Sequence, residues 1–251
     1  MPHQLPWLEP EDPFPPPEQA WGSNDPAPGL LAAGGGLGVA QLRSAYRQGT
    51  FPWFSDGQPI LWWAPDPRMV LHVPAFKLHR SMRKTLQAFR KQPKCEIRVD
   101  SAFQEVISAC AAHKREGQSG TWIVPNMVEA YTRLHAAGDA HSVETWIDGK
   151  LVGGLYCVGI GHAIFGESMF AHAKDASKIA LSALVGLCRH HGVDFIDCQQ
   201  NTRHLASLGA LEMPRSEFLK HVIAASSRPN IEWSFTPSYW NKVLPAHGNE
   251  A

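Results

Sequence analysis

The sequence predicts an α+β protein of two domains, a small aromatic-rich N-terminal domain over residues 1–74 and a larger domain over residues 75–251. Three observations lead to this prediction. The chain has 251 residues, enough for a small and a medium domain. Prolines and tryptophans gather toward its N-terminus. Beyond residue 100, helical periodicity and strand-like alternation follow one another, which is typical of a mostly antiparallel sheet flanked by helices.

The N-terminal segment is dominated by proline. Nine of the 20 prolines lie before residue 31, which predicts an extended arm on the surface over about the first 28 residues. The run Gly34–Gly36 follows no predicted strand and lacks the lysine of a phosphate-binding loop, so a tight turn is expected there. Val39, Leu42 and Tyr46 then share one face of a helix that Gly49 ends.

Three tryptophans complete the small domain. Trp53, Trp62 and Trp63 fall within eleven residues, in segments predicted as short strands broken by prolines. Such a cluster indicates either a rigid small core or a pocket with aromatic walls.

The larger domain has clearer periodicity. A helix follows Asp100, and a second helix has Pro125 in its first turn and ends at Gly138. Asp148-Gly149 predicts a two-residue hairpin turn. The remaining elements are expected in the order strand 141–147, strand 150–161, strand 163–170, a helix capped by Asp175 and ended by Gly192, strand 193–199 and a short helix over 202–209.

Composition excludes several classes of protein. With 44% hydrophobic and 18% charged residues, the chain can bury a core. Its formal net charge of zero argues against a surface that is basic throughout, although a local basic patch is compatible with it. No apolar run reaches the length of a membrane span and no secretory signal begins the chain, so we expect a cytoplasmic protein without a membrane partner. The five cysteines form no CxxC pair and are expected to be reduced.

The segment FIDCQ, Phe195–Gln199, combines polar and apolar residues at a strand end. In a strand, Asp197 and Gln199 would share one face and Cys198 would point to the other. Polar side chains there need partners. Periodicity alone leaves a functional pair and a structural hydrogen-bond network as equal alternatives.

The segment GESMF, residues 166–170, places Glu167 and Met169 on one side of a strand and Ser168 on the other. A glutamate beside a pocket can bind a cation such as a Lys or Arg side chain or an ammonium group. Alternatively, Glu167 lies on a half-exposed surface strand. Met169 suits either a plain core or a pocket that accepts several apolar shapes.

A basic segment runs from Lys77 to Arg98, with eight basic residues against one acid and a local net charge of +7. If residues 80–91 are helical, Arg80, Arg83 and Lys84 cluster. A solvated helix face is the usual meaning of such a run, but this asymmetry favours contact with a phosphate backbone.

The sequence shows no motif for a metal site or for a covalent nucleophile. The 13 histidines match no zinc spacing, so no metal is expected. The chain has no GxSxG motif, and no Cys/His pair stands out as a nucleophile, so a covalent acyl-enzyme is not indicated.

Taken together, several motifs resemble the leucyl/phenylalanyl-tRNA–protein transferase family, in order from about Gly29 to Phe218. They are GLLAAGGGL, GTFPWFSDGQPILWWAPDPRMVL, HRSMRK, GTWI, EAYTRLHAAGDAHSVETW, LVGGLY, GESMF, ASKIAL and IDCQ with HLASLGA. The resemblance implies a larger domain with an acetyltransferase-like (GNAT) fold. It also implies transfer of Leu, Phe and less readily Met from aminoacyl-tRNA to the α-amine of proteins beginning with Arg or Lys, which marks them for degradation. No cofactor is expected, and we expect a monomer.

The resemblance also assigns residues by matching motifs. The family's catalytic pair matches Asp197 and Gln199, and its active-site glutamate matches Glu167. Its tRNA-binding cluster matches Arg80, Arg83 and Lys84. Substrate-pocket positions fall on Met169, Leu155, Ile164, Leu184, Trp53 and Trp122. Ile164 and Leu184 stand where the best-known member has Phe, which alters the shape of the pocket.

The implied reaction is aminolysis of an ester. A free α-amine has a pKa of about 7.7–8.0, so orientation matters more than deprotonation. An amide is a poor base, so Gln199 is expected to position the amine, and Asp197 could hold the ammonium group. Alternatively, a hydroxyl of the terminal ribose shuttles the proton. Two other functions remain open from the sequence: an acetyl-coenzyme A-dependent N-acetyltransferase and a non-catalytic tRNA-binding protein.

Overall fold

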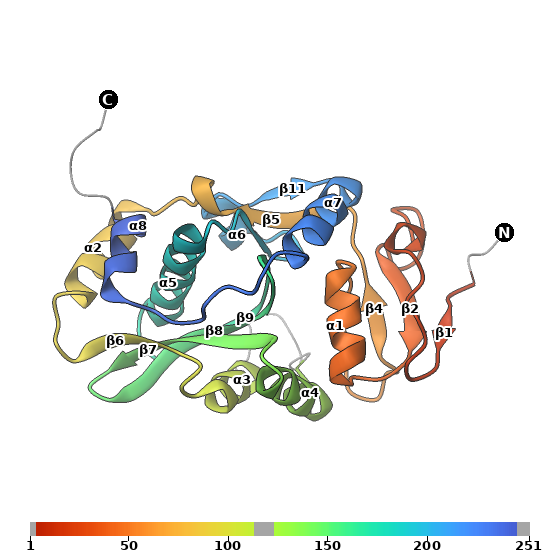
Figure 1. The fold of residues 1–251 in the computed structure, drawn as a ribbon, viewed down its shortest axis with the longest axis horizontal. Helices are drawn as coiled ribbons and strands as arrows, with labels where there is room; N and C mark the ends of the chain where they lie inside the picture. Colours follow the sequence, from red (N-terminus) through yellow and green to blue (C-terminus); the bar gives the residue numbers. More distant parts are fainter. Residues whose placement is uncertain (1–3, 113–122, 245–251) are drawn as a thin grey trace.

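The computed structural model describes residues 4–112 and 123–244, which form two sheets with helices around them (Figure 1). The strand order is β1-β2-β4-β3 in the smaller sheet and β11-β5-β10-β9-β8-β7-β6 in the larger one. Among the described residues, only the pairs β1–β2 and β9–β10 are parallel. Mixed α and β structure with mostly antiparallel strands confirms the predicted α+β class.

The elements divide between the two sheets. Around the smaller sheet lie β1 (Trp7–Leu8), η1 (Pro17–Gln19), β2 (Leu30–Gly34), α1 (Val39–Arg47), β3 (Phe51–Pro52) and β4 (Leu61–Trp63). The larger sheet is formed by β5 (Arg68–His72), β6 (Cys95–Val99), β7 (Ala140–Ile147), β8 (Lys150–Ile160), β9 (Ala163–Ala171), β10 (Phe195–Asp197) and β11 (Leu211–Met213). The remaining helices are η2 (Val73–Ala75), α2 (Arg80–Phe89), α3 (Phe103–Ala112), α4 (Pro125–Ala136), α5 (Ala176–His191), α6 (Arg203–Ser207), α7 (Arg215–Ser226), η3 (Pro237–Tyr239) and α8 (Trp240–Val243).

The proline-rich segment is not simply an arm on the surface. Trp7 and Leu8 form β1 and pair with β2, and Leu8, Phe14 and Ala20 are buried. The Phe14 ring packs edge-on against Trp62, with 4.6 Å between centroids. Prolines keep this backbone extended, as expected, but the apolar residues between them enter the core, because burying apolar surface is favourable. The prediction of a surface arm is wrong for these side chains.

The glycine run follows a strand, contrary to expectation. Leu30–Gly34 forms β2 with all five residues buried, a pattern that carries no alternation from which a strand could be predicted. Gly34 and Gly35 both have positive φ, at 83° and 76°, and turn the chain toward α1. A Cβ on Gly34 would lie 2.5 Å from the Leu8 carbonyl oxygen, so only glycine fits there.

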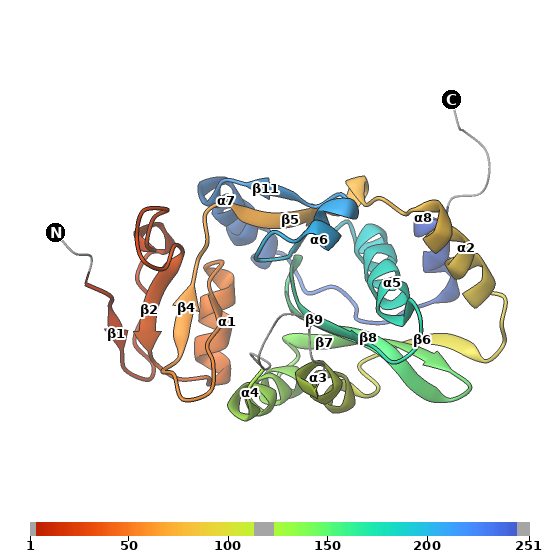
Figure 2. The same ribbon diagram turned by 180° about the vertical axis from the view of Figure 1, so that it is seen from behind.

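A meander of β7, β8 and β9 forms the centre of the larger sheet, as predicted. Asp148 and Gly149 form the expected hairpin turn, both with positive φ. Helix α5 packs on one face of the meander, and α3 and α4 cover the other, as Figures 1 and 2 both show. No helix among the described residues is both long and apolar enough to cross a bilayer.

Strand β5 lies before the expected domain boundary at residue 74, yet it pairs with β10 and β11 in the larger sheet. The two sheets therefore divide the chain between Trp63 and Arg68. This placement brings Arg68 beside the end of β10.

The ends of α5 differ in how well they were predicted. Gly192 ends the helix with a φ of 66°, as expected. Asp175 occupies the N-cap position, but its side chain makes no capping hydrogen bond and instead accepts one from Lys178 at 3.0 Å. The predicted capping role is wrong because Asp175 has a positive φ of 62° rather than the extended backbone of a usual cap.

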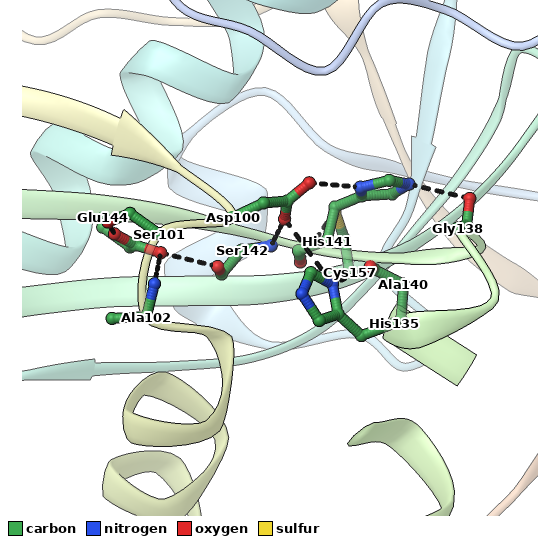
Figure 3. A network of polar contacts seen from close by, with 10 residues as sticks. All are labelled: Asp100, Ser101, Ala102, His135, Gly138, Ala140, His141, Ser142, Glu144 and Cys157. Carbon is green, nitrogen blue, oxygen red and sulfur yellow. Dashed lines mark hydrogen bonds and ion pairs between the residues drawn. The ribbon is translucent and has the colours of Figure 1, made fainter. Parts of the chain in front are cut away.

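A partly buried polar cluster links the connection between β6 and α3 to strand β7 (Figure 3). Asp100 accepts hydrogen bonds from the Ser142 backbone N–H at 2.8 Å and from His141 Nδ1 at 2.7 Å. Glu144 has no exposed surface and accepts from the Ala102 backbone N–H at 2.8 Å. These carboxylates satisfy backbone groups that the loop would otherwise leave unpaired, so the cluster stabilises the fold.

Candidate active site

A cavity of about 540 Å³ lies between the smaller domain and the larger sheet, within the usual range for small-molecule sites. Its apolar wall comprises Phe51, Trp53, Leu71, Leu155, Met169, Phe170, Ala171, Leu181, Leu184, Ile196 and Leu205. Its polar lining includes Tyr156, Glu167, Ser168, Ser177, Cys198, Gln199, Gln200, Thr202 and His204. The cavity therefore combines a large apolar surface with few ionisable groups.

The structure brings six of the residues singled out in the sequence to this cavity: Trp53, Leu155, Glu167, Met169, Leu184 and Gln199. Ile164 does not line it. That side chain is 2% exposed and belongs to the apolar core of the larger domain, together with Met69 and Val73, so its predicted place in the substrate pocket is wrong. Trp122 lies outside the described residues. The three basic residues Arg80, Arg83 and Lys84 lie on α2, which the structure confirms as a helix, and do not line the cavity.

Asp197 is held in a buried ion pair with Arg68. Arg68 Nε donates to Asp197 Oδ1 at 2.8 Å, and the guanidinium donates a second hydrogen bond to Oδ2 at 2.6 Å. Both side chains are at most 2% exposed, and the guanidinium lies between the rings of Phe51 and Phe218, at 4.7 and 4.6 Å. Asp197 therefore faces Arg68 and not the cavity.

Gln199 reaches the cavity because the strand ends before it. Strand β10 stops at Asp197, and Gln199 has a φ of 57°. Its backbone N–H donates to Asp197 Oδ1 at 2.9 Å, and its carbonyl accepts from the Met69 N–H at 3.3 Å. The expectation that Asp197 and Gln199 share one strand face is wrong, because this left-handed residue directs them to different surroundings.

Glu167 is the extra residue of a β-bulge. Tyr156 pairs with Ser168 and Cys157 pairs with Gly166, which leaves Glu167 without a partner in the ladder. Its Oε1 accepts a hydrogen bond from the Tyr46 hydroxyl at 2.8 Å and from Gln199 Nε2 at 3.3 Å. Burial raises the pKa of Glu167 to about 8; the Tyr46 hydrogen bond opposes this shift and the charge of Asp197 adds to it.

Comparison with known proteins assigns the chain to a family. The family model described as leucyl/phenylalanyl-tRNA protein transferase matches residues 70–223, and the model of its N-terminal domain matches residues 35–66. A leucyl/phenylalanyl-tRNA–protein transferase of a Polaromonas species is 62% identical, covering 98% of this chain and 96% of the relative. The chain belongs to this family. It is therefore an aminoacyltransferase.

Two further relatives have the same name. The enzyme of Albidiferax ferrireducens is 60% identical, covering 97% of this chain and 96% of the relative. That of Paraburkholderia phytofirmans is 58% identical, covering 92% and 94%. Among solved structures, a functionally unknown conserved protein of Staphylococcus epidermidis aligns with a TM-score of 0.36 and 9% identity, over 74% of this chain and 68% of that one. A similarity that weak carries no argument about the fold.

Two tyrosines extend the hydrogen-bonded chain of the transferase beyond Glu167. The hydroxyl of Tyr46, on α1, also hydrogen-bonds that of Tyr131, on α4. Burial first, and then the charge of Glu167, raise the pKa of Tyr46 and of Tyr131 well above the ordinary value. Both therefore stay protonated phenols. The sequence placed Tyr46 on the apolar face of its helix, but the hydrogen bonds of the two hydroxyls appear only in the tertiary structure.

Cys198 is the one thiol in the cavity wall of the transferase, among the described residues. Burial, with a smaller effect from the charge of Asp197, raises its pKa to about 12. A thiol with that pKa is a poor nucleophile at neutral pH. The described residues contain no group of three or more His, Cys, Asp or Glu side chains placed to hold a metal ion.

Proposed function

We propose that the protein transfers Leu, Phe and less readily Met from aminoacyl-tRNA to the N-terminal α-amine of proteins that begin with Arg or Lys, creating an N-terminal signal for degradation. The observation that carries this proposal is the apolar cavity with Gln199 and Glu167 hydrogen-bonded in its wall. Since aminoacyl-tRNA is a cytoplasmic substrate, the cytoplasm is the expected place of action, and the protein is proposed to act as a monomer.

The apolar wall suits the donor's side chain. Leu155, Met169 and Leu184 supply flexible aliphatic surface that can accept Leu, Phe or Met. One methylene in such a pocket is worth about 1–3 kcal/mol, so discrimination among these side chains is limited. The acyl group arrives as an ester, which is already activated and needs no metal or nucleotide.

Glu167 suits an acceptor that begins with a cation. Its Oε1 accepts both of its hydrogen bonds, and no donor among the described residues reaches Oε2. An ionised Glu167 can therefore accept a hydrogen bond from a guanidinium or ammonium group in the cavity. Because its pKa is about 8, a cation bound beside it would also favour its ionised form.

In the reaction, the neutral α-amine attacks the ester carbonyl carbon. The C–N bond forms, the ester C–O bond breaks, and the amine proton passes to the ribose oxygen that leaves. Gln199 Oε1 can accept a hydrogen bond from the amine and so orient it, while an amide does not take the proton. Asp197 does not hold the ammonium group in this scheme, because its oxygens are occupied by Arg68 and the Gln199 backbone.

The basic side of α2 suits the tRNA body. Arg80 and Lys84 are exposed, whereas Met82, Leu86 and Phe89 bury the opposite face of the helix. A helix fixed by its apolar face presents its cations in a constant array, which favours contact with a phosphate backbone. The larger domain is proposed to have the GNAT fold implied by the sequence motifs.

The proposal is tested with Leu-tRNA or Phe-tRNA labelled in the amino acid and model proteins that begin with Lys, Arg, Asp or Glu. We expect label on the Lys and Arg proteins only. Transfer restricted to the Asp and Glu proteins would refute the acceptor assignment. Failure to label any protein, with charged and uncharged tRNA bound equally well, would instead indicate a tRNA-binding protein.

A coenzyme A-dependent acetyltransferase is less compatible with the site. That function calls for a glycine-rich turn at which a helix N-terminus meets a pyrophosphate. The connection from β9 to α5, residues 172–175, contains no glycine, and Asp175 occupies the N-cap position. Acetyl transfer from acetyl-coenzyme A in the same assay would overturn this judgement.

A further inference from the structure

A second, smaller cavity of about 120 Å³ lies where the start of α2 meets α5 and α6. Its polar lining includes Lys77 and His79 just before α2, Ser81 in the first turn of α2, Lys178 on α5 and His204 on α6. Figures 1 and 2 both show α5 between α6 and α2. At this size the cavity can take one group of a longer ligand but not a whole drug-sized molecule.

The smaller cavity adjoins the larger one. Leu181 and His204 line both, so a ligand that leaves the larger cavity past these two side chains enters the smaller. Beyond the smaller cavity begins α2, with Arg80 exposed in its first turn. The larger cavity, the smaller cavity and the basic helix α2 are therefore successive neighbours.

The charge of the lining favours an anion. Two lysines, Lys77 and Lys178, face one acidic group, Asp175, which pairs with Lys178 at 3.0 Å. An ammonium has three donors, so Lys178 keeps two for a ligand. Burial, with the charge of Lys178 adding to it, lowers the pKa of His204, so this imidazole is neutral near pH 7 and offers a hydrogen bond rather than a charge.

We propose that the smaller cavity binds a backbone phosphate of the donor tRNA, just before the terminal adenosine, while the aminoacyl-adenosine occupies the larger cavity. This inference rests on the proposed function, because it takes the larger cavity as the aminoacyl site. The chemistry recognised is a phosphodiester with one negative charge, held by Lys77 and Lys178. Its role is to direct the single-stranded 3′ end from α2 to the reacting ester.

The test compares two leucyl donors, leucyl-adenosine and a leucyl-CCA trinucleotide, of which the second adds two cytidines and the phosphodiesters that join them. For each, kcat/KM is measured with the wild type, Lys77→Ala, Lys178→Ala and the double variant. We expect each substitution to lower kcat/KM for the trinucleotide about tenfold, the size expected for one charged hydrogen bond, and to leave leucyl-adenosine unchanged. Lys150→Ala, in the exposed β7–β8 hairpin, is the matched control and should change neither donor.

A neutral methylphosphonate at the last linkage should reduce the wild type to the level of the double variant. Equal losses with both donors, or no loss with the trinucleotide, would overturn the proposal. If kcat/KM instead falls only with acceptor proteins whose second residue is acidic, the smaller cavity binds the acceptor protein. If the wild type transfers leucine from neither donor nor from Leu-tRNA, the proposed function itself fails. In that case, the affinities of uncharged CCA and of adenosine are measured to test the phosphate site separately. If the wild type and the double variant bind CCA with equal affinity, the phosphate site is refuted.

Discussion

Replacing Arg68 by methionine should leave the buried carboxylate of Asp197 without its counter-ion. Asp197 is 2% exposed, and among the described residues only the Gln199 backbone N–H would still donate a hydrogen bond to it. Removing one partner of a buried ion pair costs about 3–5 kcal/mol, because the other charge stays buried and unpaired. For a chain of this length that loss lowers Tm by about 6–20 °C. Thermal unfolding followed by circular dichroism measures it.

A second variant separates stability from activity. In Arg68→Met with Asp197→Leu both charges are gone, and replacing a buried pair by apolar residues is often close to neutral. We therefore expect most of the lost stability to return. Aminoacyl transfer should stay low, with kcat affected more than KM, because the Gln199 N–H has lost its acceptor and its left-handed backbone has lost its support. A single variant destabilised by less than about 1 kcal/mol, or a double variant with normal kcat, would refute this reasoning.

Three further predictions concern the cavity. Since the pKa of Glu167 is raised from 4.5 to about 8, the folded state binds an extra proton between these values, so stability should fall as pH rises from about 4.5 to about 8. In Glu167→Gln, that part of the pH dependence should disappear when the free energy of unfolding is measured in urea at several pH values. An unchanged slope of this free energy against pH would contradict the prediction. Tyr46→Phe removes a donor to Glu167 and should lower kcat/KM about tenfold for Lys and Arg acceptors, whereas Tyr239→Phe, in η3, serves as the control. Leu184→Phe should narrow the cavity and shift the kcat/KM ratio toward Leu-tRNA over Phe-tRNA by about tenfold; a shift toward Phe-tRNA would show that position 184 does not limit side-chain size.

Local patterns in the sequence were enough for many elements. Helices α3 and α4 and the hairpin at Asp148-Gly149 follow from periodicity and turn chemistry, which depend on neighbours in the chain. Strand β2 escaped prediction because it is buried throughout and shows no alternation. The burial of Phe14 among prolines was likewise invisible, since its partner Trp62 is far along the chain.

The motif set identified the family, and it named Glu167 and Gln199, both of which line the cavity. Strand periodicity also put Asp197 on the same face as Gln199, and here it failed, because the strand ends between them. What Asp197 contacts was decided by Arg68, 129 residues away, and what Glu167 contacts by Tyr46 on another helix. Periodicity reports which face of its own element a residue occupies. The partner of a buried charge depends on which elements pack together, and only the tertiary structure decides that.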